Sequence, residues 1–183
     1  MTPEDDIQLA FDLAPLGLCV TRHRRISTCN DKFAEMFGYQ RTELEGESLE
    51  CLYPSHHEFE HIAIHGLPSL QKFGAYSDDR IMRHRSGKLF WCHVSGRTTD
   101  PADPFACAVW MFEDLSAVRA VTAELTPRER EVAHQLVTGK TSKQIARTLN
   151  ISPRTVEAHR ARLMHKLEVS TPGEMIARLV GIG

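Results

Sequence analysis

The chain has 183 residues with a formal net charge of -2, and 42% of the residues are hydrophobic. This length and composition suit two modest hydrophobic cores, and no apolar run approaches the roughly 20 residues that cross a membrane. The five cysteines are odd in number and lack the CxxC spacing of a zinc site. We therefore expect a cytoplasmic protein of two domains with no membrane partner.

Charge is divided unevenly along the chain. Residues 1–121 carry 12 Lys and Arg against 18 Asp and Glu, a net of -6, whereas residues 122–183 carry 10 against 6, a net of +4. A basic module attached to an acidic domain is the pattern of a DNA-binding unit with a separate partner domain.

Residues 1–14 are predicted to form an amphipathic helix that Thr2-Pro3 begins. Ile7, Ala10 and Phe11 share one of its faces, which suits packing on the same domain and packing on a second protomer equally well.

Residues 15–117 predict a sheet with helices. Strand-like residues 16–26 surround a basic turn, and a helical segment over residues 31–39 follows them. After a helical middle come three strand-like runs, over residues 79–84, 89–98 and 105–113. This order predicts an α+β domain in which an antiparallel sheet is covered by helices.

The same segment resembles a PAS domain. The resemblance rests on Cys29-Asn30-Asp31-Lys32-Phe33, Met36-Phe37-Gly38-Tyr39, the turn Arg85-Ser86-Gly87-Lys88 and the exit Asp114-Leu115-Ser116. It implies a sensor domain whose exit residues Asp114 and Ser116 relay a signal. The flavin-type signature is absent, because Cys29 precedes Asn30 instead of following it.

The interior of the predicted PAS domain leaves a packed core and a ligand cavity as alternatives. Trp91, Trp110, Phe112 and Met82 are the candidate pocket residues, because they supply apolar bulk on strands. Trp110 and Phe112 share a face, since alternate strand residues point to the same side.

His57, His61 and His65 recur at four-residue spacing, and they share a face if residues 55–64 are helical. Neutral imidazoles there are candidate ligands for haem iron or a transition metal, with solvent-exposed histidines as the alternative. We expect Gly66 and Pro68 to end this helix. The cofactor stays unknown, with haem or a small organic ligand as candidates for the PAS domain.

Residues 118–124 are predicted to form a linker helix. Leu115, Val118, Thr122 and Leu125 follow a 3-4-3 spacing, which makes one short apolar seam. Such a seam is too short for an independent coiled coil.

Residues 125–183 predict four helices, each with a polar residue that caps its start. Glu129, Gln144 and Glu174 lie three residues after Thr126, Thr141 and Thr171, and Ser152-Pro153 begins the third helix. A short helix, a turn at Asn150 and a basic helix follow one another in the order of a helix-turn-helix.

The third of these helices has a core face and an exposed face. A period of 3.6 places Val156, Leu163 and Leu167 toward the core. Small alanines on the other side permit close approach to base edges, and Glu157 can accept a hydrogen bond from cytosine. The candidate DNA-binding residues are Lys143, Arg154, Thr155, Glu157, Ala158, Ala161, Arg162 and His165.

Residues 125–132 and 151–160 resemble the LuxR-type helix-turn-helix of the FixJ/NarL branch. The resemblance implies an all-α four-helix domain whose third helix enters the major groove. It implies base contacts at Glu157, Ala158 and Ala161, and phosphate contacts at Lys143 and Arg154. The last helix, with Met175, Ile176 and Leu179, would pair two protomers.

Together these features predict a DNA-binding transcriptional regulator whose PAS domain senses a small ligand or haem and controls dimer geometry. The alternative is a PAS domain that serves only for dimerisation or protein docking. Expected partners are double-stranded promoter DNA and a second copy of the chain, with RNA polymerase as a further candidate. An enzyme is not expected, because the P-loop, dinucleotide and kinase motifs are missing.

Overall fold

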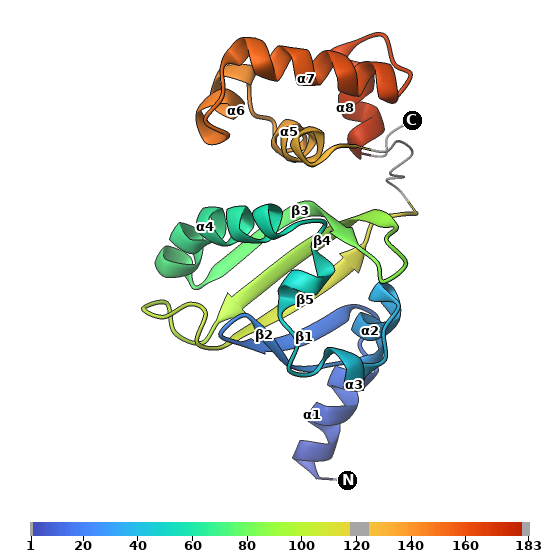
Figure 1. Cartoon of the computed structure of the whole chain (residues 1–183). Coiled ribbons are helices and arrows are strands. Elements are labelled where there is room, and N and C mark those ends of the chain that lie inside the picture. Colours follow the sequence, from blue (N-terminus) through green and yellow to red (C-terminus); the bar gives the residue numbers. More distant parts are fainter. Residues whose placement is uncertain (1, 118–124, 181–183) are drawn as a thin grey trace. The chain divides into compact units, whose positions relative to one another are not determined.

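A computed structural model describes residues 2–117 and 125–180 of the chain (Figure 1). The chain divides into two compact units, Met1–Asp114 and Leu115–Gly183. The predicted linker helix over residues 118–124 lies outside the described residues. No helix among the described residues combines the length and the apolar character needed to span a bilayer.

The first unit is built on a five-stranded antiparallel sheet of order β2-β1-β5-β4-β3. The N-terminal strand β1 therefore pairs with the last strand, β5, and β2 and β3 lie at the two edges. The expected run over residues 79–84 is longer in the structure, because residues from Ala75 onward pair with β4. The strands are β1 (Gly17–Arg22), β2 (Arg25–Cys29), β3 (Ala75–Arg83), β4 (Leu89–Thr98) and β5 (Ala108–Asp114).

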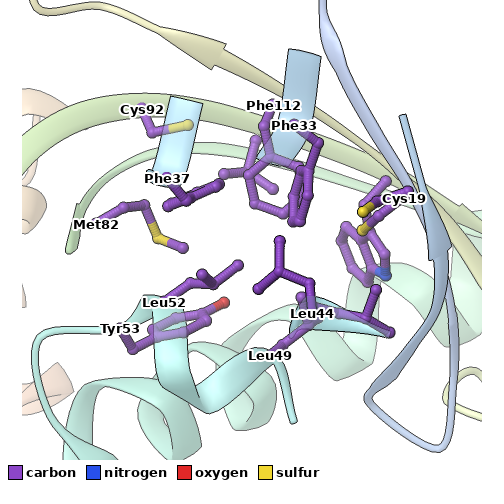
Figure 2. Packing of buried hydrophobic residues seen from close by; sticks show 14 of the residues in the cluster. Cys19, Phe33, Phe37, Leu44, Leu49, Leu52, Tyr53, Met82, Cys92 and Phe112 are labelled. Carbon is purple, nitrogen blue, oxygen red and sulfur yellow. The ribbon is translucent and has the colours of Figure 1, made fainter. Parts of the chain in front are cut away.

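Helices cover one face of this sheet and enclose the core with it (Figures 1 and 2). The Phe33 ring lies edge-on to Phe112, with centroids 5.0 Å apart, and Phe37 lies between Phe90 and Phe112. These aromatic contacts fix the helices to the strands. The helices are α2 (Asp31–Phe37), α3 (Arg41–Leu44), the 3-10 helix η1 (Leu49–Leu52) and α4 (His56–Phe73).

Helix α4 corrects the prediction that Gly66 and Pro68 end it. It continues to Phe73 and ends at Gly74, whose φ of 65° is the left-handed conformation of a helix C-terminus. Pro68 removes only one backbone donor. Leu70, two residues later in the same helix, is buried in the core. Gly66 lets the helix approach Tyr76, because a Cβ there would lie 3.3 Å from the ring. Tertiary packing therefore outweighs the two helix-breaking residues.

Helix α1 (Pro3–Asp12) begins at Thr2 with a capping box and buries none of its residues. Ile7 is 71% exposed and Leu13, just after the helix, is 73% exposed. The helix is joined to the first unit by polar contacts: Asn30 donates to the Phe11 carbonyl, and Asp12 pairs with Arg41. Ile7, Leu9 and Leu13 are therefore largely exposed among the described residues.

The described residues of the second unit form four helices. Thr126, Thr141 and Thr171 each exchange hydrogen bonds with the residue three positions later, as their capping boxes predicted. The helices are α5 (Pro127–Val137), α6 (Ser142–Thr148), α7 (Pro153–Lys166) and α8 (Pro172–Val180). The predicted fold class, an α+β domain followed by a helical helix-turn-helix region, is confirmed.

Candidate functional site

Helix α7 presents one exposed polar face. Ser152 caps its start by accepting a hydrogen bond from the Thr155 amide at 3.0 Å. Val156 and Leu163 are fully buried, which fixes the rotation of the helix. All eight candidate DNA-binding residues are exposed, Lys143 on α6 and the other seven on α7: Arg154, Thr155, Glu157, Ala158, Ala161, Arg162 and His165.

Arg160 supports this face instead of forming it. Its Nη1 donates to the Ser142 hydroxyl at 2.7 Å and lies 3.6 Å from the Glu157 carboxylate. The first contact ties α7 to the start of α6. The second places a cation beside Glu157, which reduces the repulsion that this carboxylate would exert on a phosphate.

An ion pair between the buried Glu129 and the partly exposed Lys166 holds α7 against α5. Lys166 Nζ donates to Glu129 Oε2 at 2.7 Å, and the same oxygen accepts from the Thr126 amide at 2.7 Å. Burial raises the pKa of the Glu129 carboxyl, but hydrogen bonds from Lys166 and Thr126 outweigh it and leave the pKa below 4.5. Sequence reasoning identified Glu129 only as a cap, because Lys166 lies 37 residues away.

This carboxylate should make the second unit sensitive to acid. The pKa of Glu129 is lower in the folded state than in the unfolded chain. The stabilisation that this carboxylate provides is therefore complete above pH 4.5 and is lost as pH falls through the folded-state pKa. We expect E129Q to weaken the unit at about neutral pH and to flatten its acid response. Urea unfolding followed by far-ultraviolet circular dichroism tests this. Fluorescence monitors the first unit separately, because both tryptophans, Trp91 and Trp110, lie there. An unchanged acid response in E129Q would contradict the assignment.

Helix α8 corrects part of the predicted dimer interface. Met175 and Leu179 are buried within the single chain, since α8 packs on α5 and α7 with this apolar stripe. Of the three predicted interface residues, only Ile176 keeps partly exposed surface.

A cavity of about 40 Å³ lies between α4 and the sheet. Trp110 and Phe112 line it, whereas Met82 and Trp91 do not. Its other walls combine aliphatic and aromatic side chains with a few polar groups. The lining residues are Thr21, Arg24, Leu49, Tyr53, Phe59, Ile62, Ala63, Gly66, Leu70, Tyr76, Arg80, Val94, Phe105, Trp110 and Phe112.

Strand geometry explains the two misplaced pocket residues. Phe90 and Cys92 belong to the core on either side of Trp91, so Trp91 points to the opposite face of the sheet. Met82 does point into the core, but it fills space beside Phe37 and Leu52 (Figure 2).

Polar groups missed by sequence reasoning line the cavity wall. Arg80 is 4% exposed, and its Nη1 donates to the Tyr53 hydroxyl at 2.6 Å. Its Nε donates to Asp78 Oδ1 at 2.8 Å, and the Tyr76 hydroxyl donates to Asp78 Oδ2 at 3.1 Å. Burial raises the pKa of Tyr53 and that of Tyr76, so both hydroxyls stay protonated. The network is therefore fully built before any ligand arrives.

Arg24 closes one side of the same cavity. Its guanidinium lies 3.5 Å from the centroid of the Phe59 ring, and its Nη1 pairs with Glu60 at 2.8 Å. Arg24 itself has a φ of 63°, in the tight turn between β1 and β2. This turn therefore holds a cation over the aromatic edge of the cavity.

The three helix histidines do not form the predicted metal or haem site. His57, His61 and His65 lie along one side of α4, where neighbouring rings are tilted to each other, with centroids 6.1 and 3.9 Å apart. Their spacing spans about 12 Å along the helix axis, so the three cannot converge on one ion. Within residues 2–117 and 125–180, no three His, Cys, Asp or Glu side chains are grouped to hold a metal.

A haem does not fit this cavity either. The cavity of about 40 Å³ is far below the roughly 300 Å³ at which pockets for larger ligands begin. None of the three histidines lines it.

The predicted relay residues lie at the exit from the sheet. Asp114 is the last residue of β5 and is the register partner of Cys92 on β4. Ser116 follows two residues later, just before the segment that the structure leaves undescribed. Their place in the chain suits a relay, which stays a prediction.

Comparison with known proteins identifies both units. Residues 15–117 match the PAS domain family, and residues 123–178 match the bacterial regulatory proteins of the luxR family. A PAS domain of a LuxR-family transcriptional regulator from Burkholderia thailandensis, solved in complex with ethanol, is 50% identical with a TM-score of 0.59. The likeness covers 60% of this chain and 96% of that one.

Two further relatives resemble the second unit or the whole chain. FixJ of Bradyrhizobium diazoefficiens is 39% identical over 75 residues, which are 41% of this chain and 35% of FixJ. The Vibrio cholerae VqmA dimer, solved without target DNA, is 20% identical with a TM-score of 0.56. That likeness covers 100% of this chain and 90% of VqmA, and it shows the fold alone. The chain spans about a third or less of the length of the first curated relatives it matches. It belongs to the LuxR family of DNA-binding regulators and carries a PAS domain ahead of its helix-turn-helix domain.

Proposed function

We propose that this regulator binds promoter DNA through α7 as a dimer, and that a small molecule in the PAS cavity controls its affinity. The observation that carries the proposal is the cavity itself, which is lined by a buried and hydrogen-bonded polar network. A well-formed apolar pocket with a few convergent polar groups is the usual form of a small-molecule site. A protein that binds promoter DNA in a bacterium acts in the cytoplasm, which is the location we propose. RNA polymerase is a further proposed partner. No catalytic role is proposed.

Two relatives support this proposal. The PAS domain from Burkholderia thailandensis was solved with ethanol, and VqmA was solved with a ligand and DNA together. By analogy, ligand occupancy here would act through Asp114 and Ser116 on the segment leading to α5. It would shift the population of dimers whose α7 helices match the spacing of two half-sites.

A PAS domain used only for dimerisation is the second candidate. The exposed apolar residues Ile7, Leu9 and Leu13 at and just after α1 favour it, because several exposed apolar side chains on one short segment suit a partner surface. Ile176 on α8 is the proposed contact between the second units. Two results together would support this second function. Ligand would have no effect on DNA binding, and the double variant I7E/L13E would make the chain monomeric.

The proposed phosphate contacts predict a defined salt effect. K143A and R154A should each weaken binding to every duplex and lower the salt slope by about one unit, since each removes one phosphate contact. The slope is measured by fluorescence anisotropy with a duplex selected from a random library. R97A, which removes an exposed arginine of the PAS domain, is the matched control. Unchanged slopes in both variants would reject the two phosphate assignments.

A further inference from the structure

The Tyr53 hydroxyl can donate a hydrogen bond. Tyr53 is 7% exposed, and its hydroxyl accepts a hydrogen bond from Arg80 Nη1 at 2.6 Å. Among the described residues, no acceptor receives the hydroxyl hydrogen of Tyr53 itself. A buried donor without an acceptor is unfavourable, so a molecule that supplies the acceptor is favoured at this wall.

The same wall is electrically neutral. The Arg80 guanidinium is matched by the Asp78 carboxylate, which receives donors from both Arg80 and Tyr76. Arg24, which closes another side of the cavity, is likewise paired with Glu60. An added anion would therefore meet arginines that are already paired, and an added cation would meet an already neutralised aspartate. Either would lose its hydration without gaining a counter-charge, which is unfavourable in a buried site.

Size restricts the ligand further. The cavity volume is about 40 Å³, and a water-sized group needs roughly 10–15 Å³ by the same measure. There is therefore room for about three or four non-hydrogen atoms. Much of the remaining wall is carbon, with contributions from Ile62, Leu70, Val94 and Phe112.

We propose that the cavity selects a small uncharged molecule with one oxygen acceptor, a short ketone, aldehyde, amide or alcohol, and that Tyr53 donates the hydrogen bond that recognises it. The proposal rests on the proposed function, in which this cavity is the ligand site. It makes Tyr53 the specificity-determining residue, and it makes Arg80 and Asp78 the pair that holds the Tyr53 hydroxyl in place.

Acetone, acetate and isobutene provide the test, because they share one planar skeleton of four non-hydrogen atoms. Acetone offers a neutral acceptor, acetate adds a charge, and isobutene has no acceptor. Binding to the full chain is followed by the indole N–H signal of Trp110 in nuclear magnetic resonance. This group lines the cavity and donates to Thr21 at 3.0 Å, so it reports directly on occupancy.

Acetone should bind saturably, and acetate at least tenfold more weakly. Y53F should lower acetone affinity about three- to tenfold, the range expected for one hydrogen bond, and leave isobutene affinity unchanged. Isobutene binding also verifies that the variant cavity is folded. Y39F is the matched control, because Tyr39 stacks on Arg85 outside the cavity. Equal affinities for acetone and acetate, or an acetone affinity unaffected by Y53F, would overturn the proposal.

Failure of this inference is distinct from failure of the proposed function. Acetone that binds through Tyr53 without changing DNA affinity supports the ligand class and contradicts ligand control. A larger or charged effector that displaces the Trp110 signal and changes DNA affinity supports ligand control and overturns the ligand class.

Discussion

A glutamate in place of Ala161 should lower affinity for the selected duplex about 100-fold or more. Ala161 is exposed on α7, and its small side chain allows close approach to the floor of the major groove. A carboxylate there would face phosphates and base acceptors, and like charges brought together at an interface cost several kcal/mol. Anisotropy measurements with the full chain and the selected duplex test this.

A small uncharged substitution at Ala161 separates the effect of charge and bulk from loss of the fold. Ala161→Ser should keep most of the affinity, because the hydroxyl is small and uncharged. Both variants should unfold at the wild-type urea concentration, since the position is exposed. Wild-type affinity in Ala161→Glu would show that this face of α7 does not approach the bases.

Adding one methyl group at Gly96 should disrupt the first unit. A Cβ there would lie 2.1 Å from Trp110 Cε3, in a ring held in place by a 3.0 Å hydrogen bond from its Nε1 to Thr21. The ring must move into the cavity or the strand must shift, which costs about 1–3 kcal/mol of unfolding free energy. Gly96→Ala should lower the urea midpoint seen by tryptophan fluorescence and abolish acetone binding.

Gly66→Ala is the matched control for that change. It adds the same methyl group to the same cavity region, but the nearest ring atom of Tyr76 is 3.3 Å away. Its cost should be smaller, and alanine offsets part of it through a better helix propensity. If both variants unfold at the same urea concentration as wild type, Trp110 is not fixed as described.

The sequence predicted the second unit well because its signals are local. Thr126 and Glu129, or Thr141 and Gln144, cap a helix within one turn of chain. The 3.6 period also placed Val156 and Leu163 correctly in the core. Such features need no knowledge of distant neighbours.

The cavity wall depended on contacts that the sequence does not reveal. Asp78 and Arg80 read as solvent-facing charges, yet they lie on the core side of β3 and neutralise each other. The pairing of β3 with β4 puts these two charges on the same side of the strand, and Tyr53, from the segment after η1, accepts a further hydrogen bond from Arg80. These contacts offset the cost of burying the charges.

An apolar stripe on α8 and a set of histidines on α4 were assigned the wrong role for a similar reason. The stripe containing Met175 and Leu179 was attributed to a partner, although it serves the core of its own domain. The periodicity of a helix shows that one face is buried but not what buries it. In the same way, the spacing of His57, His61 and His65 places them on one face but too far apart for one metal ion.

The most direct test of ligand control is the DNA affinity of the full chain with the cavity empty and filled. Anisotropy titrations with the selected duplex would compare wild type, wild type saturated with acetone, and Ala63→Leu, which fills the cavity with a side chain. We predict that filling changes affinity about fivefold or more, the lower range of coupling between sites. Identical titrations in all three cases would contradict the account.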